Sequence, residues 1–174
     1  ILDLLEEPRE ESSVSSHILR KGDVKGHIEF RHVSFCYPNT DKFALNDVSL
    51  EVAAGETIAF VGPSGAGKTT LSNLVARFYA PTVGQVLLDG REVSELEIES
   101  FRRLLGIVEQ DVFLFDGTIA DNIGYGGQYP TLEHIQHAAE VANIREFIER
   151  LPEKYDTLIG ERGVRLSGGQ RQRV

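Results

Sequence analysis

Three stretches of the first ninety positions predict β-strands, the first two because hydrophobic and polar residues alternate in them and the third because it is a short apolar run. The first stretch runs from His27 to about Pro38 with one irregularity, the second covers 46–52, and the third covers 85–88. Asp89-Gly90 closes the third stretch as a turn. The opening of the domain should therefore be rich in antiparallel hairpins.

Two apolar runs outside these hairpins also predict strands, a buried one at 56–61 and a short one at 106–108. A helix should follow the first run at 71–78, where leucine, valine and phenylalanine recur at helical spacing. Later in the chain, helices are expected at 97–105, 131–142 and 144–151, short helical pieces within 110–127, and a last helix starting at Gln170.

A glycine-rich loop joins the predicted strand at 56–61 to the helix that follows it. It matches the pattern G-x-x-x-x-G-K-[ST], with Gly62, Gly67, Lys68 and Thr69 at the fixed positions. Glycines at 62, 65 and 67 allow positive φ, so successive backbone N–H groups can face a phosphate chain, and the helix N-terminus adds its own. A plain glycine-rich turn with a surface lysine is the alternative. The strand–loop–helix context favours binding of nucleotide phosphates.

Composition narrows the class of protein. The 174 residues suffice for one domain with a core, and the net charge of −9 argues against binding to a nucleic-acid backbone. The single cysteine, Cys36, excludes an intramolecular disulfide and is read as a small apolar residue in a strand. The five histidines are assigned to surface or packing roles. Neither a transmembrane stretch nor a signal peptide is expected, and the absence of methionine indicates a piece of a longer polypeptide.

A second glycine pair occurs about a hundred residues after the first loop, in Leu166-Ser-Gly-Gly-Gln170. Ser167 can cap the helix expected there, and the free N–H groups at the helix start can address a phosphate. On its own this segment is better read as a capped helix after a turn. Paired with the glycine-rich loop, it resembles the signature motif that accompanies the Walker A motif in ATP-binding cassette (ABC) proteins.

The resemblance covers the whole chain and implies a site for ATP and Mg²⁺. The positions that match nucleotide-binding residues are Tyr37, Gly62, Pro63, Ser64, Gly65, Ala66, Gly67, Lys68, Thr69, Thr70, Gln110, Ser167, Gly168, Gly169 and Gln170. Tyr37 is similar to the A-loop aromatic that stacks on adenine, although it could equally be a core tyrosine at a strand end. Lys68 and Gln110 would be catalytic, and Thr69 and Gln110 would bind the metal.

Several segments resemble exporters within this family. They are the linker-like 1–8, the segment 113–123, and the loop 156–163, which in exporters touches the membrane domain. The resemblance implies a transmembrane domain on the same polypeptide, a second nucleotide-binding domain in a head-to-tail dimer, and a place on the cytoplasmic face of a membrane, with the piece itself soluble. A soluble ABC ATPase acting on nucleic acid or ribosomes is the alternative, and a non-catalytic nucleotide-binding module is a third possibility.

The expected architecture is α/β: a P-loop NTPase core sheet, an antiparallel β subdomain, and a helical subdomain that carries the signature motif. Residues 1–26 should form a linker, 27–174 the N-terminal part of the nucleotide-binding domain, and about 111–174 its helical subdomain. The family's Walker B strand, which bears the catalytic carboxylates, has no counterpart in the sequence. We therefore expect negligible ATP hydrolysis by this chain alone, and marginal stability because a sheet edge is left open.

Overall fold

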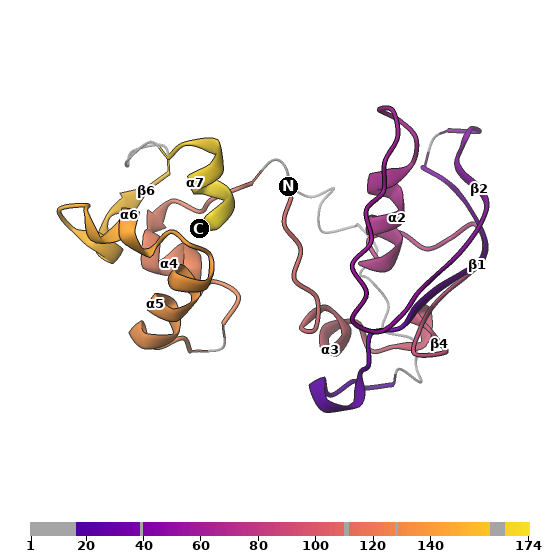
Figure 1. Ribbon diagram of the computed structural model, residues 1–174, viewed down its shortest axis with the longest axis horizontal. Coiled ribbons are helices and arrows are strands. Elements are labelled where there is room, and N and C mark those ends of the chain that lie inside the picture. The colour runs from indigo at the N-terminus through magenta and orange to yellow at the C-terminus, as the bar shows by residue number, and fades with distance from the viewer. Residues whose placement is uncertain (1–16, 39, 110–111, 128, 161–165) are drawn as a thin grey trace, which may run out of the picture. The chain divides into compact units, whose positions relative to one another are not determined.

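The computed structural model describes residues 17–38, 40–109, 112–127, 129–160 and 166–174, which divide into two compact units (Figure 1). The sheet unit is Ile1–Gly106 and the helical unit is Ile107–Val174. Each unit has its own cluster of buried apolar side chains. Each unit can therefore be described by itself.

The sheet unit is built on four antiparallel strands in the order β2-β1-β3-β4. Their bounds are Ile28–Cys36 for β1, Phe43–Val52 for β2, Val83–Leu88 for β3 and Arg91–Glu92 for β4. The central strand β1 places Phe30 opposite both Leu50 and Val86, so one apolar position joins three strands. These strands confirm the hairpins that the alternating pattern predicts.

The irregularity predicted in β1 is a bulge at His32. The pairing register shifts between Phe30 and Val33 against β2, and His32 has φ of 49°. An extra residue at this point bends the strand and increases its twist. Gly84 of β3 lies against the bulge at φ of 83°, and a Cβ atom there would collide with the carbonyl oxygens of Arg31 and His32.

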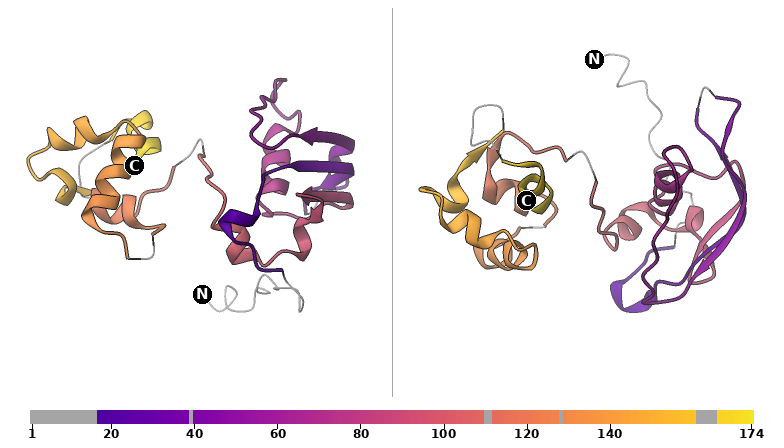
Figure 2. Two further views of the ribbon diagram at one scale, coloured as in Figure 1. Left: turned by 60° about the horizontal axis from the view of Figure 1, so that its bottom comes forward. Right: turned by 45° about the horizontal axis from the view of Figure 1, so that its top comes forward.

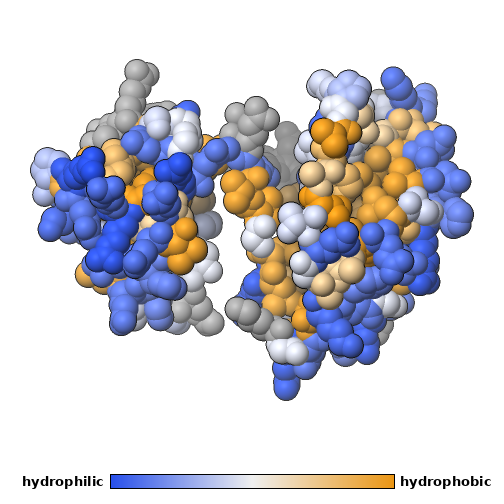
Figure 3. All heavy atoms as spheres, viewed as in Figure 1, coloured by the Kyte–Doolittle hydropathy of each residue, from blue (hydrophilic) through white to orange (hydrophobic). Residues whose placement is uncertain are grey.

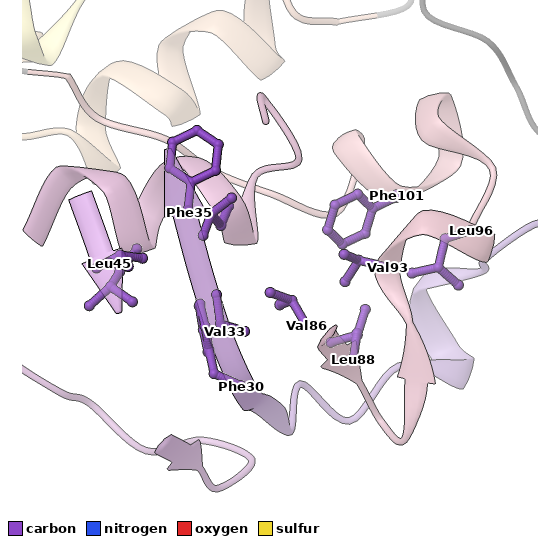
Figure 4. Packing of buried hydrophobic residues seen from close by; sticks show 11 residues of the cluster. Phe30, Val33, Phe35, Leu45, Val86, Leu88, Val93, Leu96 and Phe101 are labelled. Atoms are coloured by element: carbon purple, nitrogen blue, oxygen red, sulfur yellow. The ribbon is translucent and has the colours of Figure 1, made fainter. Parts of the chain in front are cut away.

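One helix covers a face of this sheet. Helix α2, Lys68–Val75, lies along the sheet (Figure 2). Its Leu71 and Leu74 are buried in one cluster with apolar residues of β1, β2 and β3. Helix α3, Ile98–Arg102, adds Phe101 to the same core (Figure 4). Helix α3 is shorter than the predicted 97–105, whereas α2 has the predicted length and is shifted along the sequence. Helix α2 starts three residues early and ends at Val75 because Arg77 adopts a left-handed conformation, φ 56°.

The described part of the predicted linker, 17–26, is hydrogen-bonded to the rest of the sheet unit. His17 forms a bridge with Leu96, and the Leu19 N–H donates to the Ser100 hydroxyl over 3.0 Å. Short 3-10 helices occur at Lys21–Asp23 and Val93–Glu95. Asp89 then accepts backbone N–H bonds from residues 25, 26 and 27. This one carboxylate fixes the approach of the chain to β1.

Asp89 makes stability depend on pH. Partial burial raises the pKa of its carboxyl, but the three N–H donors, His27 first, outweigh it and lower that pKa below the ordinary value. The stabilisation is thus complete above the unfolded-state pKa of about 3.9 and is lost as the pH falls through the lower folded-state pKa. We expect Asp89→Asn to cost about 1–2 kcal/mol at pH 7. Urea unfolding at pH 7 and pH 3 should show the gap between wild type and variant shrinking in acid; a constant gap would contradict this.

Two predicted strands are wrong. Residues 56–61 and 106–108 form no strand, and their apolar side chains are exposed, Val61 at 95% and Val108 at 78%. An apolar run becomes a buried strand only where neighbouring strands accept its hydrogen bonds. Among the described residues no strand pairs with either run. Figure 3 shows hydrophobic residues, in orange, on the surface of the sheet unit.

The helical unit holds short helices around a small two-stranded sheet. Strands β5, Gly117–Thr118, and β6, Leu158–Ile159, pair antiparallel. The helices are α4, Ile119–Gly124; α5, Leu132–Val141; α6, Arg145–Glu149; the 3-10 turn Lys154–Asp156; and α7, Gly168–Arg173. Ile119, Ile148 and Ile159 are fully buried at its centre. Asn143, at φ 57°, interrupts α5 and α6 as predicted.

Candidate phosphate-binding site

The glycine-rich loop keeps the backbone shape that its sequence predicts. Gly65 and Gly67 adopt φ of 80° and 89°, a region that residues with a Cβ rarely occupy. Gly67 is the N-cap residue of α2, and it has no side-chain cap, so the first N–H groups of the helix stay available. Loop and helix N-terminus together therefore present backbone donors suited to an anion.

Gly67 also ties the loop to the sheet. A Cβ atom at this position would lie 2.7 Å from Leu45 Cδ2 and 2.9 Å from the Ala44 carbonyl oxygen, both in β2. Leu45 is itself buried in the sheet-unit core. Glycine is thus required here for close approach as well as for its φ, and the base of the loop rests directly on β2.

Lys68 points back over the loop. Its ammonium donates to the carbonyl oxygens of Gly62, over 2.9 Å, and Pro63, over 2.8 Å. The loop residues 62–66 are exposed, as is Thr69, the next residue of the helix. A positive charge thus lies beside exposed backbone donors, an arrangement that suits the outer phosphates of a nucleotide.

Of the two residues expected to bind Mg²⁺, the structure describes Thr69. The exposed Thr69 hydroxyl is a hard oxygen ligand of the kind Mg²⁺ prefers, and it follows Lys68 directly. Gln110 lies outside the described residues. No cluster of three potential protein ligands occurs in the part of the chain that the structure describes. Thr69 would therefore hold Mg²⁺ together with phosphate oxygens, rather than in a cage of carboxylates.

Tyr37, the candidate base-stacking residue, is half-buried just beyond β1. Its hydroxyl lies 3.0 Å from the hydroxyl of the buried Thr70, in the first turn of α2. Its ring packs against the core through Phe35 and also contacts Tyr79. The structure is thus compatible with both interpretations of Tyr37. It packs at the edge of the core, as a core tyrosine would, and it is bonded to the helix that follows the glycine-rich loop, as a base-stacking residue would be.

The signature segment forms the capped helix that the sequence predicts. Ser167 Oγ accepts the N–H of Gln170 over 3.2 Å, and Gln170 Oε1 accepts the N–H of Ser167 over 2.8 Å. This reciprocal pair is a capping box at the start of α7. Gly168 and Gly169 are exposed with open space where a side chain would stand. The first turn of α7 can therefore approach a ligand or partner closely.

The predicted site residues fall in both units. Residues 37 and 62–70 lie in the sheet unit, and residues 167–170 lie in the helical unit. Of the exporter-like loop at 156–163, residues 161–163 lie outside the described residues. Three of the described histidines have side-chain partners: His27 bonds Glu51, His32 bonds Asp47, and His134 completes the capping box of α5. Cys36 ends β1 as a half-buried thiol.

Sequence reasoning missed Tyr79. Tyr79 belongs to no motif, and it lies just after the helix that the spacing of apolar residues predicts at 71–78. Its contacts with Phe35 and Tyr37 arise from the left-handed turn at Arg77, which spacing does not report. Since Tyr79 lies far from Phe35 and Tyr37 in the sequence, no local pattern could have predicted these contacts.

The described residues hold no helix long and apolar enough to cross a membrane. The family model described as ABC transporter matches residues 45–174. The chain is 48% identical over 151 residues to an uncharacterized ABC transporter ATP-binding protein, YwjA, of Bacillus subtilis, covering 87% of this chain and 26% of that protein. It is 46% identical over 175 residues to the ATP-dependent lipid A-core flippase of Dechloromonas aromatica, covering 100% and 29%.

Among solved structures, a bacterial Atm1-family ABC exporter with ATP bound superimposes with a TM-score of 0.87 at 41% identity. This match covers 99% of the chain and 30% of the exporter chain. The chain thus spans between a quarter and a third of the length of these relatives. Its α/β fold, with an antiparallel sheet, a glycine-rich loop before α2 and a capped helix α7, matches part of an ABC nucleotide-binding domain, and the chain belongs to the ABC transporter family.

Proposed function

We propose that this chain is the ATP-binding part of an ABC exporter, which couples ATP binding and hydrolysis to transport across a membrane. The observation that carries the proposal is the loop geometry: the Lys68 ammonium lies over the carbonyls of residues 62 and 63 at the N-terminus of α2. The relatives include proteins named as flippases and an exporter with ATP bound.

Each site residue that the structure describes has a role that follows from its position, and Gln110 has one that follows from its motif. Lys68 neutralises the charge of the outer phosphates, where negative charge is greatest during phosphoryl transfer. The N–H groups of the loop and of the first turn of α2 bind the same oxygens. Thr69 holds Mg²⁺, which offsets phosphate charge when bound. Tyr37 supplies a face for the adenine ring, and Gln110, by its motif, acts on the metal and the attacking water.

The signature helix completes the site of a second nucleotide-binding domain. Helix α7 begins with the exposed Gly168 and Gly169, directly after its N-cap residue Ser167. Its first turn therefore suits the γ-phosphate of an ATP held by another copy. The pairing is head-to-tail, so each ATP is held between one copy's loop and the other copy's signature. Each copy thus supplies one loop and one signature, so two copies form two complete sites.

The helical unit also offers a surface for the transmembrane domain of the same polypeptide, at the cytoplasmic face of the membrane. Phe113, Phe115 and Tyr125 are exposed at 78%, 43% and 71%. The Phe115 ring contacts the other two, with its centroid 5.3 Å from that of Phe113 and 4.2 Å from that of Tyr125. An exposed aromatic cluster of this kind favours a protein partner.

The net charge of −9 and the exporter-like relatives disfavour the alternative function, in which the protein acts on nucleic acid or ribosomes.

Fractionation of cells that make the complete polypeptide tests the proposal. Mg-ATP hydrolysis should stay with the membranes through washes in high salt and carbonate, and it should be absent from membranes carrying Lys68→Ala. Lys42→Ala, which removes an exposed lysine of the same unit, should leave the activity intact. Activity that leaves the membranes with ribosomes or nucleic acid would favour the alternative instead.

A further inference from the structure

Tyr79 lies in a turn that sends two neighbouring aromatic residues to different partners. Helix α2 ends at Val75, and Arg77 takes φ of 56°. Beyond it, the Phe78 ring lies 5.4 Å from the Arg102 guanidinium carbon, whereas the Tyr79 ring lies 5.1 Å from the Tyr37 ring. Although Phe78 and Tyr79 are similarly exposed, at 43% and 37%, only Tyr79 contacts the candidate base-stacking residue.

Tyr37 is held at its ring and at its hydroxyl. Phe35 meets the ring edge-on at 4.9 Å and 79°, and Tyr79 meets it at 5.1 Å and 85°. Both contacts are T-shaped, a favourable geometry for aromatic pairs. The third contact is the hydroxyl bond to Thr70 over 3.0 Å. Since its ring and its hydroxyl both have partners, the Tyr37 side chain is held in one orientation.

The turn that carries Tyr79 is itself tied to β1. The Thr82 N–H donates to the Ser34 carbonyl over 2.9 Å, and the Cys36 N–H donates to the Thr82 hydroxyl over 3.2 Å. Both bonds reach the end of β1, from which Tyr37 projects. The segments that carry Tyr79 and Tyr37 are thus held together by these two hydrogen bonds as well as by the contact between the rings.

We propose that Tyr79 is a positioning residue for nucleobase recognition: it holds the Tyr37 ring in the orientation that stacks on adenine. The inference rests on the proposed function, because it assigns Tyr37 to the base. Tyr79 does not touch the phosphates in this scheme. Its removal should therefore weaken binding of a nucleotide and leave binding of a bare phosphate chain unchanged.

The test compares Mg-ATP with magnesium tripolyphosphate, which has the phosphate chain without the base, by calorimetric titration of the chain. Tyr79→Leu should weaken Mg-ATP binding about three- to tenfold, in line with the loss of one or two aromatic contacts. Tripolyphosphate affinity should not change. Tyr79→Phe keeps the ring and should bind as wild type. Phe78→Leu removes an adjacent ring of similar exposure and should change neither affinity.

Equal weakening of both ligands in Tyr79→Leu would overturn the inference, because it would show a purely structural role. So would unchanged Mg-ATP binding. A wild-type chain that binds neither ligand would contradict the proposed function of this chain instead. In that event NMR of the Tyr37 ring decides the inference: its resonances should shift and broaden in Tyr79→Leu but not in Phe78→Leu, and identical spectra would overturn it.

Discussion

Replacing Lys68 with alanine should weaken Mg-ATP binding to this chain by roughly ten- to a hundredfold, the equivalent of about one charge-assisted hydrogen bond to phosphate. The ammonium already lies over the loop, 2.9 and 2.8 Å from two carbonyl oxygens. It is therefore preorganised, and its loss removes the local positive charge without moving the backbone donors. Calorimetric titration with Mg-ATP measures the change.

The same substitution should scarcely affect folding. The two carbonyl oxygens that lose the ammonium lie in an exposed loop and can bond water in its place. We expect the urea midpoint of Lys68→Ala to match that of wild type, and Lys42→Ala to match it in both assays. If Lys68→Ala kept its affinity for Mg-ATP, the loop would not be the phosphate site.

The largest loss of stability should come from Gly84→Ala. The new methyl group would meet the carbonyl oxygens of Arg31 and His32 at the β1 bulge, and alanine is strained at φ 83°. Strain of about 1–2 kcal/mol plus overpacking of a similar size gives a loss of about 3 kcal/mol in the free energy of unfolding. Urea unfolding followed by circular dichroism measures it.

Gly90→Ala separates the two causes. Gly90 has nearly the same φ, 80°, but nothing lies within 4 Å of an added Cβ. It should therefore lose only the strain contribution, about 1 kcal/mol. Equal losses in the two variants would show that the bulge accommodates the methyl group and that close packing at Gly84 does not matter.

Local patterns predicted those parts of the fold that local forces determine. Alternation located β1 and β2, a short apolar run located β3, and Ser167 caps the helix that was predicted to follow it. The run at 56–61 shows the limit of such patterns. Its composition is typical of a buried strand, but a strand needs a neighbour, and no described strand pairs with it.

The site was predictable to the same extent. The pattern of glycines predicted the loop and its positive φ values. The hydrogen bonds of the Lys68 ammonium to the carbonyl oxygens of Gly62 and Pro63 were not predicted. The contact of Gly67 with Leu45 and the contact of Tyr79 with Tyr37 were not predictable. Both join residues far apart in sequence, and both depend on how α2 and its following turn lie on the sheet.

The exposed run Thr57-Ile-Ala-Phe-Val61 has a practical consequence for work with this protein. It combines β-branched and aromatic residues with no charge and no proline, a composition prone to intermolecular strand pairing, and Val61 is 95% exposed. Sulfate and similar salts strengthen apolar association. Low protein concentration and a mild detergent are thus better suited than ammonium sulfate precipitation to keeping the chain monomeric during purification.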